Sequence, residues 1–307
     1  MKLLITGSSG FVGRNLLCAM PKDWKIFAIY HNSEDFVSFL KKNSMEHIVP
    51  LQVDLRSHDE VKRILKYSSV FDGCVFLAAN GDPAVSVENP IFDLESNTLT
   101  ILNLVTAVTF GKFIYFSSGA VYDGLKGPVS PTSPVWPKLP YAISKLASEH
   151  YLRHFKERGR IKDLMVVRFF GAYGPHEPPR KIYSKLIKQF GIDKNPDFTI
   201  HGNGQNLIDA MYIDDTVRAI QLLLGAESIN RTFDLYSGCP LTLTQLAENA
   251  AQAFNLEAKI SYKGNVPEYN EFFSNDQYMS KELQFSPSTT LEEGLSKFFK
   301  CLTNTLP

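Results

Sequence analysis

A glycine triplet with the pattern Gly7-Ser-Ser-Gly10-Phe-Val-Gly13 lies near the start of the chain. It follows an apolar run, Lys2 to Thr6, that predicts a strand, and it opens a helical stretch, Gly13 to Met20. In a strand–loop–helix unit the first glycine permits the tight turn, the second lets the backbone approach a pyrophosphate and the third lets the helix press on the sheet. The loop therefore predicts a dinucleotide-type fold, and its expected cofactor contacts are Gly7, Gly10, Phe11, Val12 and Gly13.

The rest of the first half alternates short apolar runs with amphipathic stretches of helical length, which predicts a doubly wound parallel sheet of the Rossmann-like α/β class. The expected strands are Lys2 to Thr6, Lys25 to Tyr30, His47 to Gln52, Gly73 to Leu77, Lys112 to Ser117 and Leu164 to Phe169. The expected helices are Gly13 to Met20, Glu34 to Asn43, Asp59 to Lys66, Pro90 to Phe110 and Pro140 to Arg158.

A change in composition after Arg168, where glycines and prolines cluster, predicts a domain boundary. We expect a dinucleotide-binding domain over residues 1–169, joined by a returning segment near 205–225, and a smaller mixed α/β substrate domain over 170–307. The expected helices of the second domain, Leu243 to Phe254 and Leu291 to Leu302, flank a stretch rich in Pro, Asn and Glu, Val266 to Asn275.

The charges balance, with 32 Lys and Arg against 32 Asp and Glu, which disfavours a nucleic-acid partner because such binding needs excess cation. No apolar run approaches a membrane span and no signal peptide is recognised, so we expect a cytoplasmic protein without a membrane partner. The cysteines form no CxxC pattern, which indicates neither a metal site nor disulfides but buried thiols: Cys18, Cys74, Cys239 and Cys301.

The end of the second expected strand bears on cofactor choice, because an acidic residue there binds the ribose hydroxyls of NAD. The chain reads Tyr30-His31-Asn32-Ser33, and the nearest acids, Glu34 and Asp35, come a few residues late. The absence of an acid at the strand end favours NADP slightly, although no arginine stands there either and NAD stays open. The side chains that would meet a 2′-phosphate are His31, Asn32, Ser33 and Arg14. A turn histidine exposed to solvent is the alternative reading of His31.

Asp54 and Leu55 follow the third expected strand. An acid there can accept a hydrogen bond from the adenine amino group, and an apolar neighbour can pack on the ring. An Asp after a strand is also a common turn or helix cap.

Tyr141 and Lys145 are four residues apart on an expected helix that begins at Pro140, so their side chains share one face. Ser118 follows the fifth expected strand, at the carboxyl edge where open α/β sheets bind ligands. A tyrosine base needs its pKa lowered from about 10 by about 3 units, roughly 4 kcal/mol. An ammonium about 4 Å away supplies about that much at an effective dielectric near 20. Ser118 would align a reacting hydroxyl whose proton Tyr141 takes.

The chain resembles the extended short-chain dehydrogenases/reductases, and within them the sugar-nucleotide epimerase/dehydratase group. The resemblance covers nearly the whole chain. It rests on motifs in the order and spacing of that family: Gly7 to Gly13, Asp54-Leu55, Leu77-Ala78-Ala79, Asn97, Ser118 with Val121-Tyr122, Tyr141-Ala-Ile-Ser-Lys145, Arg168 to Pro175 and Tyr212-Ile-Asp-Asp215.

The resemblance implies a catalytic triad of Ser118, Tyr141 and Lys145. It also implies that Ala78, Ala79 and Asn97 contact or position the cofactor, with Pro175 near the nicotinamide. The alternative roles are a buried strand end for the alanines, an amide that caps or lies inside a helix for Asn97, and a loop stiffener for Pro175. A homodimer through the helices after Pro90 and Pro140 is expected by analogy.

The chain departs from this family at several positions. Dehydratases of the group carry acidic residues directly after the catalytic Ser or Thr, and decarboxylases keep a Glu there, whereas this chain has Gly119 and Ala120. We therefore expect oxidation at a sugar carbon, C4 by analogy, followed only by rotation and reduction, or a one-way keto-sugar reduction.

Residues expected to grip the substrate phosphates are also replaced. Gly171 stands where the family has Asn, Ile208 stands where it has Arg before Asp209, and Val266 to Phe272 replaces an Arg-containing stretch. A basic group of Arg180, Lys181, Lys185 and Lys188 offers a substitute, with a solvated helix face as the alternative reading. His176 is a further candidate substrate contact, with an exposed loop histidine as the commoner case.

These observations predict an NAD(P)-dependent epimerase or keto-sugar reductase acting on a nucleotide sugar. A reductase of a carbonyl substrate without a nucleotide is the first alternative, encouraged by the missing phosphate ligands. A cofactor-binding sensor without turnover is the second, and the intact Ser118, Tyr141 and Lys145 speak against it.

Overall fold

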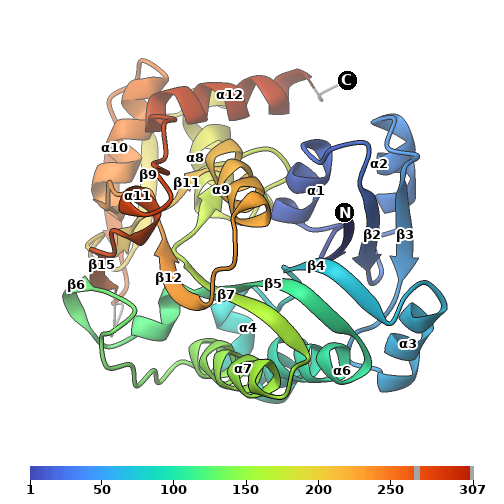
Figure 1. Ribbon diagram of the computed structural model, residues 1–307. Helices are drawn as coiled ribbons and strands as arrows, with labels where there is room; N and C mark the ends of the chain where they lie inside the picture. Colours follow the sequence, from blue (N-terminus) through green and yellow to red (C-terminus); the bar gives the residue numbers. More distant parts are fainter. Residues whose placement is uncertain (266–269, 305–307) are drawn as a thin grey trace. The chain divides into compact units, whose positions relative to one another are not determined.

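The computed structural model describes residues 1–265 and 270–304 and shows two compact units (Figure 1). The first unit is built from three stretches of the chain: Met1–Asp123, Val135–Phe169 and Ile220–Phe233. The second unit comprises Gly124–Pro134, Phe170–Ala219 and Asp234–Pro307. Because each unit combines separate stretches, segments far apart in the sequence complete the same fold.

A seven-stranded sheet with the order β12-β7-β5-β4-β1-β2-β3 forms the centre of the first unit. The pairs from β7 across to β3 are all parallel. The strands are β1 (Lys2–Thr6), β2 (Lys25–Tyr30), β3 (Ile48–Gln52), β4 (Val70–Phe76), β5 (Thr109–Ser118), β7 (Ile161–Phe169) and β12 (Arg231–Leu235). This architecture confirms the doubly wound parallel sheet that the alternating sequence pattern predicts.

Helices cover both faces of this sheet. Figure 1 shows α1 and α2 on one face and α3, α6 and α7 on the other. The bounds are α1 (Phe11–Cys18), α2 (Phe36–Lys42), α3 (His58–Lys62), η1 (Arg63–Lys66), α4 (Pro83–Glu88), α5 (Pro90–Leu94), η2 (Glu95–Leu99), α6 (Thr100–Ala107), η3 (Gly119–Tyr122) and α7 (Pro140–Glu157). Fully buried apolar side chains fill the layer between sheet and helices; Phe76 and Phe113, for example, stack with ring centroids 5.9 Å apart.

The helix expected over Pro90 to Phe110 is wrong in two respects. It is interrupted by the π-helical segment η2, and it ends at Ala107. The next residue, Val108, is extended, and Thr109 already pairs with Val70 in the sheet. The β-branched pair Val108-Thr109 favours the strand, so β5 begins before the expected Lys112.

The second unit is a mixture of helices and two-stranded sheets, which matches the expected mixed α/β class. Its sheets pair β10 with β13, β11 with β8, β14 with β9 and β15 with β6. Its elements are β6 (Lys126–Val129), β8 (Ala172–Tyr173), α8 (Ile182–Leu186), η4 (Ile187–Ile192), β9 (Asp197–His201), β10 (Leu207–Ile208), β11 (Met211–Tyr212), β13 (Leu241–Thr242), α10 (Leu243–Ala253), β14 (Lys259–Lys263), β15 (Glu271–Ser274), α11 (Tyr278–Lys281) and α12 (Leu291–Asn304). The helix α9 (Ile213–Gly225) has residues in both units.

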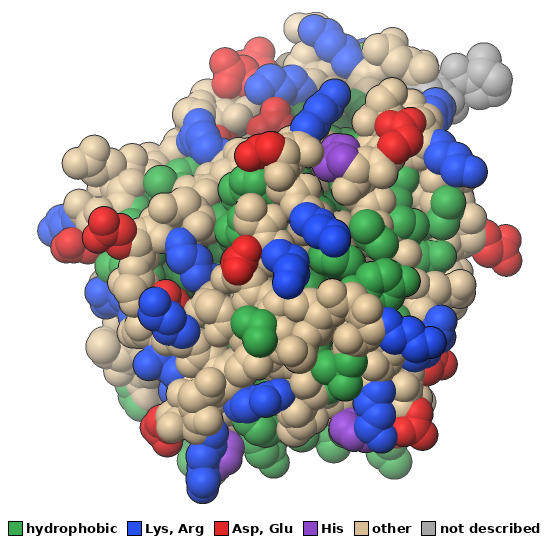
Figure 2. All heavy atoms as spheres, turned by 45° about the vertical axis from the view of Figure 1, so that its right-hand side comes forward, with side chains coloured by type: hydrophobic (Ala, Val, Ile, Leu, Met, Phe, Trp, Pro, Cys, Tyr) green, Lys and Arg blue, Asp and Glu red, His purple; other side chains and the backbone are tan. Residues whose placement is uncertain are grey.

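The surface and the cysteines bear on the expected surroundings of the protein. On the face in Figure 2, Lys and Arg side chains are interspersed with Asp and Glu. Within residues 1–265 and 270–304, no helix combines the length and apolar character that crossing a membrane requires. The cysteines are free thiols, but only Cys74 is buried; Cys18 and Cys239 are exposed, so the expectation that all are buried is wrong.

Candidate functional site

The glycine loop connects β1 to α1 with a backbone that side chains would obstruct. Gly7 has a φ of 64°, and a Cβ there would lie 2.8 Å from the backbone nitrogen of Ala78. A Cβ on Gly13 would lie 2.4 Å from the carbonyl oxygen of Gly7. Gly10 is the N-cap of α1 and places no side chain at the start of this helix. These contacts fit the roles that the sequence assigns to a pyrophosphate-binding loop.

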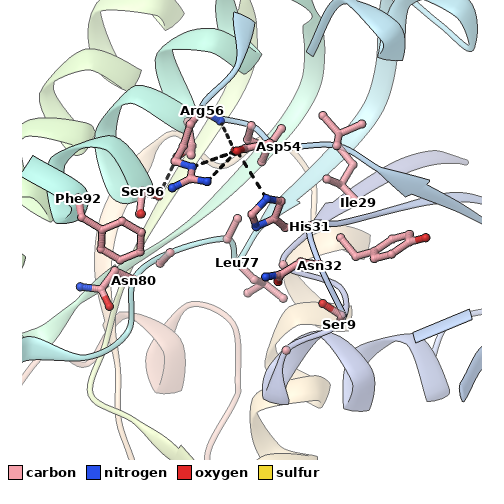
Figure 3. A pocket seen from close by; sticks show the side chains of 18 residues that line it. Ser9, Ile29, His31, Asn32, Asp54, Arg56, Leu77, Asn80, Phe92 and Ser96 are labelled. Atoms are coloured by element: carbon pink, nitrogen blue, oxygen red, sulfur yellow. Dashed lines mark hydrogen bonds and ion pairs between the residues drawn. The ribbon is translucent and has the colours of Figure 1, made fainter. Parts of the chain in front are cut away.

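A cavity of about 610 Å³ opens at the carboxyl ends of β1, β2, β3 and β4 (Figure 3). Its volume lies within the range of about 300–1,000 Å³ common for ligand sites. Its lining includes most of the cofactor contacts expected from sequence. Those residues are Gly7, Gly10, His31, Asn32, Asp54, Leu55, Ala78 and Ala79. Apolar side chains also line the cavity: Ile29, Val53, Leu77 and Phe92.

Asp54 is tied to an arginine that the sequence reading missed. Both Nε and Nη2 of Arg56 donate to its carboxylate, at 3.0 and 2.7 Å, and Nε2 of His31 lies 3.5 Å away. Figure 3 shows His31 and Arg56 pointing at the same carboxylate. The hydrogen bonds from Arg56 hold the pKa of Asp54 below its ordinary value. Arg56 also lines the cavity. The only sequence feature that could have indicated its contact with Asp54 is its position two residues later.

Arg14 and Ser33, two of the expected phosphate contacts, are engaged with Asp35. Nη2 of Arg14 lies 2.8 Å from Oδ1 of Asp35 and 3.1 Å from Oγ of Ser33. The hydrogen bond from Arg14 lowers the pKa of Asp35. Arg14 and Ser33 are not among the residues that line the cavity, and their side chains bond to the acid that follows the strand end. Their contact with a 2′-phosphate stays a prediction.

Ser118, Tyr141 and Lys145 are brought together in the first unit. Ser118 is the last residue of β5, and Tyr141 lies in the first turn of α7 after Pro140. Ser118 lies near enough to Tyr141 to lower the pKa of its phenol. Nζ of Lys145 lies 5.8 Å from the centroid of the Tyr141 ring and donates to the carbonyl oxygen of Phe116 at 2.9 Å. The helical spacing thus places phenol, hydroxyl and ammonium at one strand end.

The pKa of Tyr141 runs against the sequence argument. Burial raises the pKa of the phenol, Ser118 opposes this, and the charge of Asp93 raises it further. Burial also lowers the pKa of Lys145 to about 8, while the charges of Asp93 and Glu149 act in the opposite direction. The sequence argument counted only the ammonium and left out burial, which is the largest influence on the pKa of Tyr141.

Asn97 belongs to the wall behind this site. It lies within the π-helical segment η2, is 1% exposed, and does not line the cavity. Its Nδ2 donates to Oδ1 of Asp93 at 2.8 Å and to Oγ of Ser144 at 3.1 Å. Its contact with α7 is therefore consistent with a role in positioning that helix. Its location inside a helical segment agrees with the alternative role given above.

A buried ion pair that the sequence did not reveal connects α7 to β7. The carboxylate of Glu149 accepts from Nε and Nη2 of Arg168, at 3.1 and 3.0 Å, and from Oγ of Ser117 at 2.6 Å. Nη1 of Arg168 donates to the hydroxyl of Tyr122 at 3.1 Å. This network fixes the helix that carries Lys145 against two strands of the sheet.

The expected substrate contacts and Pro175 lie in the second unit. His176 has a positive φ of 68° and is exposed, as is Arg180, whereas Lys181 is partly buried. The last lysine of the basic group, Lys188, pairs with Asp193 at 3.0 Å. The role of His176, Arg180 and Lys181 as substrate contacts stays a prediction.

The structure describes the surroundings of two departures from the family pattern. Gly171 has a φ of 136°, and a Cβ there would lie 3.3 Å from the Cβ of Ala210. Asp209, after Ile208, accepts hydrogen bonds from the backbone nitrogens of Ser237 and Gly238. Residues 266–269 of the replaced stretch Val266 to Phe272 lie outside the described residues.

A parallel sheet with a glycine loop, a cavity at its carboxyl edge and a Ser–Tyr–Lys group defines a protein of the extended short-chain dehydrogenase/reductase class. The chain belongs to the NAD dependent epimerase/dehydratase family, whose model matches residues 3–238. This membership confirms the family and the enzyme class expected from the sequence motifs.

Individual relatives span nearly the whole chain. The chain is 28% identical to "UDP-glucuronate 4-epimerase" of Thermodesulfobacterium geofontis, over 96% of this chain and 94% of that protein. It is 24% identical to "dTDP-D-glucose 4,6-dehydratase" of Mus musculus, over 96% of this chain and 87% of that protein. The relatives thus include both reaction types of the family.

A solved structure has the same fold. It is UDP-glucuronic acid 4-epimerase from Bacillus cereus in complex with UDP-glucuronic acid and NAD, with a TM-score of 0.87. The two proteins are 23% identical and cover 100% of each other. At this identity the similarity establishes the fold.

Proposed function

We propose that this protein is an NAD(P)-dependent sugar-nucleotide epimerase that acts at a ring carbon, with C4 the expected position. The observation that carries the proposal is the joined Ser118, Tyr141 and Lys145 in the same unit as the cavity behind the glycine loop. The epimerases among the relatives support the substrate class. Gly119 and Ala120 supply no acid beside Ser118, which favours epimerisation over elimination.

Each side chain has a part in this reaction. A bound nicotinamide supplies the chemistry of accepting a hydride and returning it. Ser118 binds and orients the sugar hydroxyl, and Tyr141 takes its proton and later gives it back to the carbonyl oxygen. Lys145 carries positive charge beside the phenol and stabilises its deprotonated form. Burial raises the pKa of Tyr141, which favours the neutral phenol, the form that donates a proton to a ketone oxygen.

The alternative of a one-way keto-sugar reductase uses the same residues and is separated by the product. Purified protein is incubated with UDP-glucose, UDP-glucuronate or dTDP-glucose, and products are followed by proton NMR. The epimerase proposal expects the C4 epimer with no net change in cofactor absorbance. Stoichiometric oxidation of NADPH with a keto-sugar, without epimer formation, would establish the reductase instead, and a stable 4-keto-6-deoxy product would contradict both.

A reductase acting on a carbonyl compound without a nucleotide is a second candidate. Gly171 and Ile208 replace residues that the family uses toward the substrate, and this observation favours it. If Arg180 and Lys181 replace the missing ligands, changing both to Ala raises the substrate KM much more than the cofactor Kd. Small, equal effects on the two constants would dispose of the replacement and favour this second candidate.

We propose NADP as the preferred cofactor. The end of β2 presents His31 and Asn32 to the cavity in place of an acid, and Asp54 is paired with Arg56. No unpaired carboxylate among these side chains would therefore repel a 2′-phosphate. The test identifies the nucleotide released by denaturing the purified protein and measures the Kd of NADP and NAD for the stripped protein. A Kd for NAD equal to or below that for NADP would overturn the preference.

We further propose a cytoplasmic homodimer. The free cysteines support a reducing compartment. Exposed apolar side chains on α4, α5 and α7 support pairing of two copies through these helices. They are Val87, Ile91, Leu94, Ile143 and Tyr151.

A further inference from the structure

Asp93 on α5 is a buried carboxylate to which the reaction above gives no part. It is 1% exposed, and three neutral donors bind it. Nδ2 of Asn80 and Nδ2 of Asn97 each donate to Oδ1 at 2.8 Å, and Oγ of Ser144 donates to Oδ2 at 2.6 Å. Burying an ionised carboxylate with only neutral partners is costly, so stability alone is a poor reason for its presence.

The partners of Asp93 connect the cavity to the helix of the reacting groups. Asn80 and Phe92, the residue before Asp93, both line the cavity. Ser144 lies on α7 directly before Lys145, and its Oγ is 2.9 Å from the carbonyl oxygen of Tyr141. A contact from Asn97 to Ser144 closes a ring of hydrogen bonds with Asp93. The ring therefore holds the first turn of α7 against the cavity wall.

The charge of Asp93 also reaches both reacting groups. It raises the pKa of Tyr141, in the same direction as the larger effect of burial. It also raises the pKa of Lys145, where the larger effect of burial lowers it. For Lys145, burial favours loss of the proton and Asp93 favours its retention. A negative charge at this place thus acts on whether the lysine is an ammonium near neutral pH.

We propose that Asp93 is a positioning residue that fixes α7 on the cavity wall through its hydrogen bonds to Asn80, Asn97 and Ser144. From this position its charge also acts on Lys145. The inference rests on the proposed function in assigning Tyr141 and Lys145 to the reaction. The charge effect and the hydrogen bonds are measurable without substrate.

Besides Asp93, Glu149 acts on the pKa of Lys145, and further titratable groups lie on the elements packed around the lysine. Glu149 and Tyr141 lie on α7 itself, and Tyr115 on β5 has its ring centroid 5.2 Å from Nζ. The charge of Glu149 is shared with Arg168 on β7, which also contacts Tyr122 on η3. The remaining acids on these segments are Glu88 on α4, Glu95 on η2, Glu157 on α7 and Asp163 on β7.

The test measures the pKa of Lys145 directly in the cofactor-free protein. Lysine labelled with ¹³C at Cε is titrated by NMR, and the signal of Lys145 is identified by its loss in Lys145→Met. In Asp93→Asn, which removes the charge and keeps the shape, we expect the pKa of Lys145 to fall by about one unit. Asp163→Asn is the matched control, because Asp163 is also buried and bonded to neutral groups, Ser228 and Asn230, and the pKa should stay unchanged.

A second variant separates the hydrogen bonds from the charge and remains informative if Asp93→Asn does not fold. Ser144→Ala keeps the charge of Asp93 and removes one donor. We expect an unchanged pKa of Lys145 and amide exchange about fivefold faster in the turn from Tyr141 to Lys145, the equivalent of ~1 kcal/mol. Unchanged exchange there would overturn the positioning role, and an unchanged pKa of Lys145 in Asp93→Asn would overturn the charge role.

The pH profile of epimerisation connects the inference to the reaction. Loss of the charge lowers the pKa of Tyr141 and of Lys145 together, so the whole profile of Asp93→Asn should move to lower pH, which a structural role alone would not cause. If the wild type is active and the pH profile of Asp93→Asn does not move, the inference is contradicted and the proposed function stands. An inactive wild type whose Lys145 still responds to Asp93→Asn would contradict only the proposed function.

Discussion

Tyr141 is subject to two opposing influences. Burial and the charge of Asp93 stabilise the neutral phenol, whereas Ser118 stabilises the phenolate. The pKa of Tyr141 is raised, so burial dominates. Proton removal therefore needs added positive charge beside the phenol, which a bound oxidised nicotinamide would supply.

Removing the phenolic hydroxyl should abolish the reaction and leave the cofactor site intact. We expect Tyr141→Phe to lower kcat by about 10²–10⁴-fold, because proton transfer to and from the sugar loses its group. Tyr151→Phe, on the same helix with a side chain that is 45% exposed, is the control and should keep wild-type kcat. Turnover is measured by NMR and cofactor Kd by fluorescence; near-normal turnover in Tyr141→Phe would remove it from the mechanism.

Lys145 should leave a signature in stability as well. Its pKa of about 8 lies below the ordinary value of 10.5, so between these values the unfolded chain binds more protons than the folded protein. The free energy of unfolding attributable to Lys145 should then rise with pH, by about 1 kcal/mol between pH 8 and 9. Urea denaturation of wild type and Lys145→Met at each pH gives this difference; a difference that is constant or falls with pH would contradict it.

Sequence reasoning at single positions succeeded where a residue's role is local. Gly7 and Gly13 are needed by the backbone around them, so their spacing alone predicts the loop. It failed where partners come from elsewhere in the chain, since nothing in the sequence pairs Arg14 with Asp35, nor Asp93 with Ser144.

At the scale of helices and strands, the sequence again predicts local features but not contacts between distant segments. The strands and helices of the first unit follow from period and punctuation, but η2 does not, because apolar periodicity is nearly the same for π and α turns over five residues. The pair of Glu149 and Arg168 was equally hidden. Both ends read as ordinary charged residues, and only the packing of α7 on β7 buries them.

Neutralising Glu149 should loosen this packing. Glu149→Gln leaves Arg168, which is 4% exposed, without its carboxylate, and we expect a loss of about 3–5 kcal/mol in the free energy of unfolding. Arg153→Gln is the control, since Arg153 contacts the same carboxylate from a side chain that is 40% exposed, and should cost less than about 1 kcal/mol. Urea denaturation at pH 7 measures both; equal costs would mean that the buried pair is not special.

For the chain as a whole, the proposed dimer gives the exposed apolar residues a reason. Single exposed apolar residues are normal on a protein surface. Here, however, Ile91 and Leu94 lie on α5 and Ile143 lies on α7, two helices that contact each other. A second copy covering this face would also cover the helix that carries Tyr141 and Lys145, so dimerisation and the geometry of the reacting groups should be linked.

A charge on this face should separate the two copies. Ile91 is 70% exposed, and we expect Ile91→Glu to convert a particle of twice 34.5 kDa into one of 34.5 kDa in light scattering after gel filtration, because a carboxylate cannot be buried unpaired at an apolar contact. Leu65→Glu, which places the same charge at an exposed apolar position on η1, should stay a dimer. If α7 is held in part by the partner, the monomeric variant also loses activity at concentrations where Leu65→Glu keeps it. A monomeric wild type, or dissociation in both variants, would show that the contact lies elsewhere or does not form.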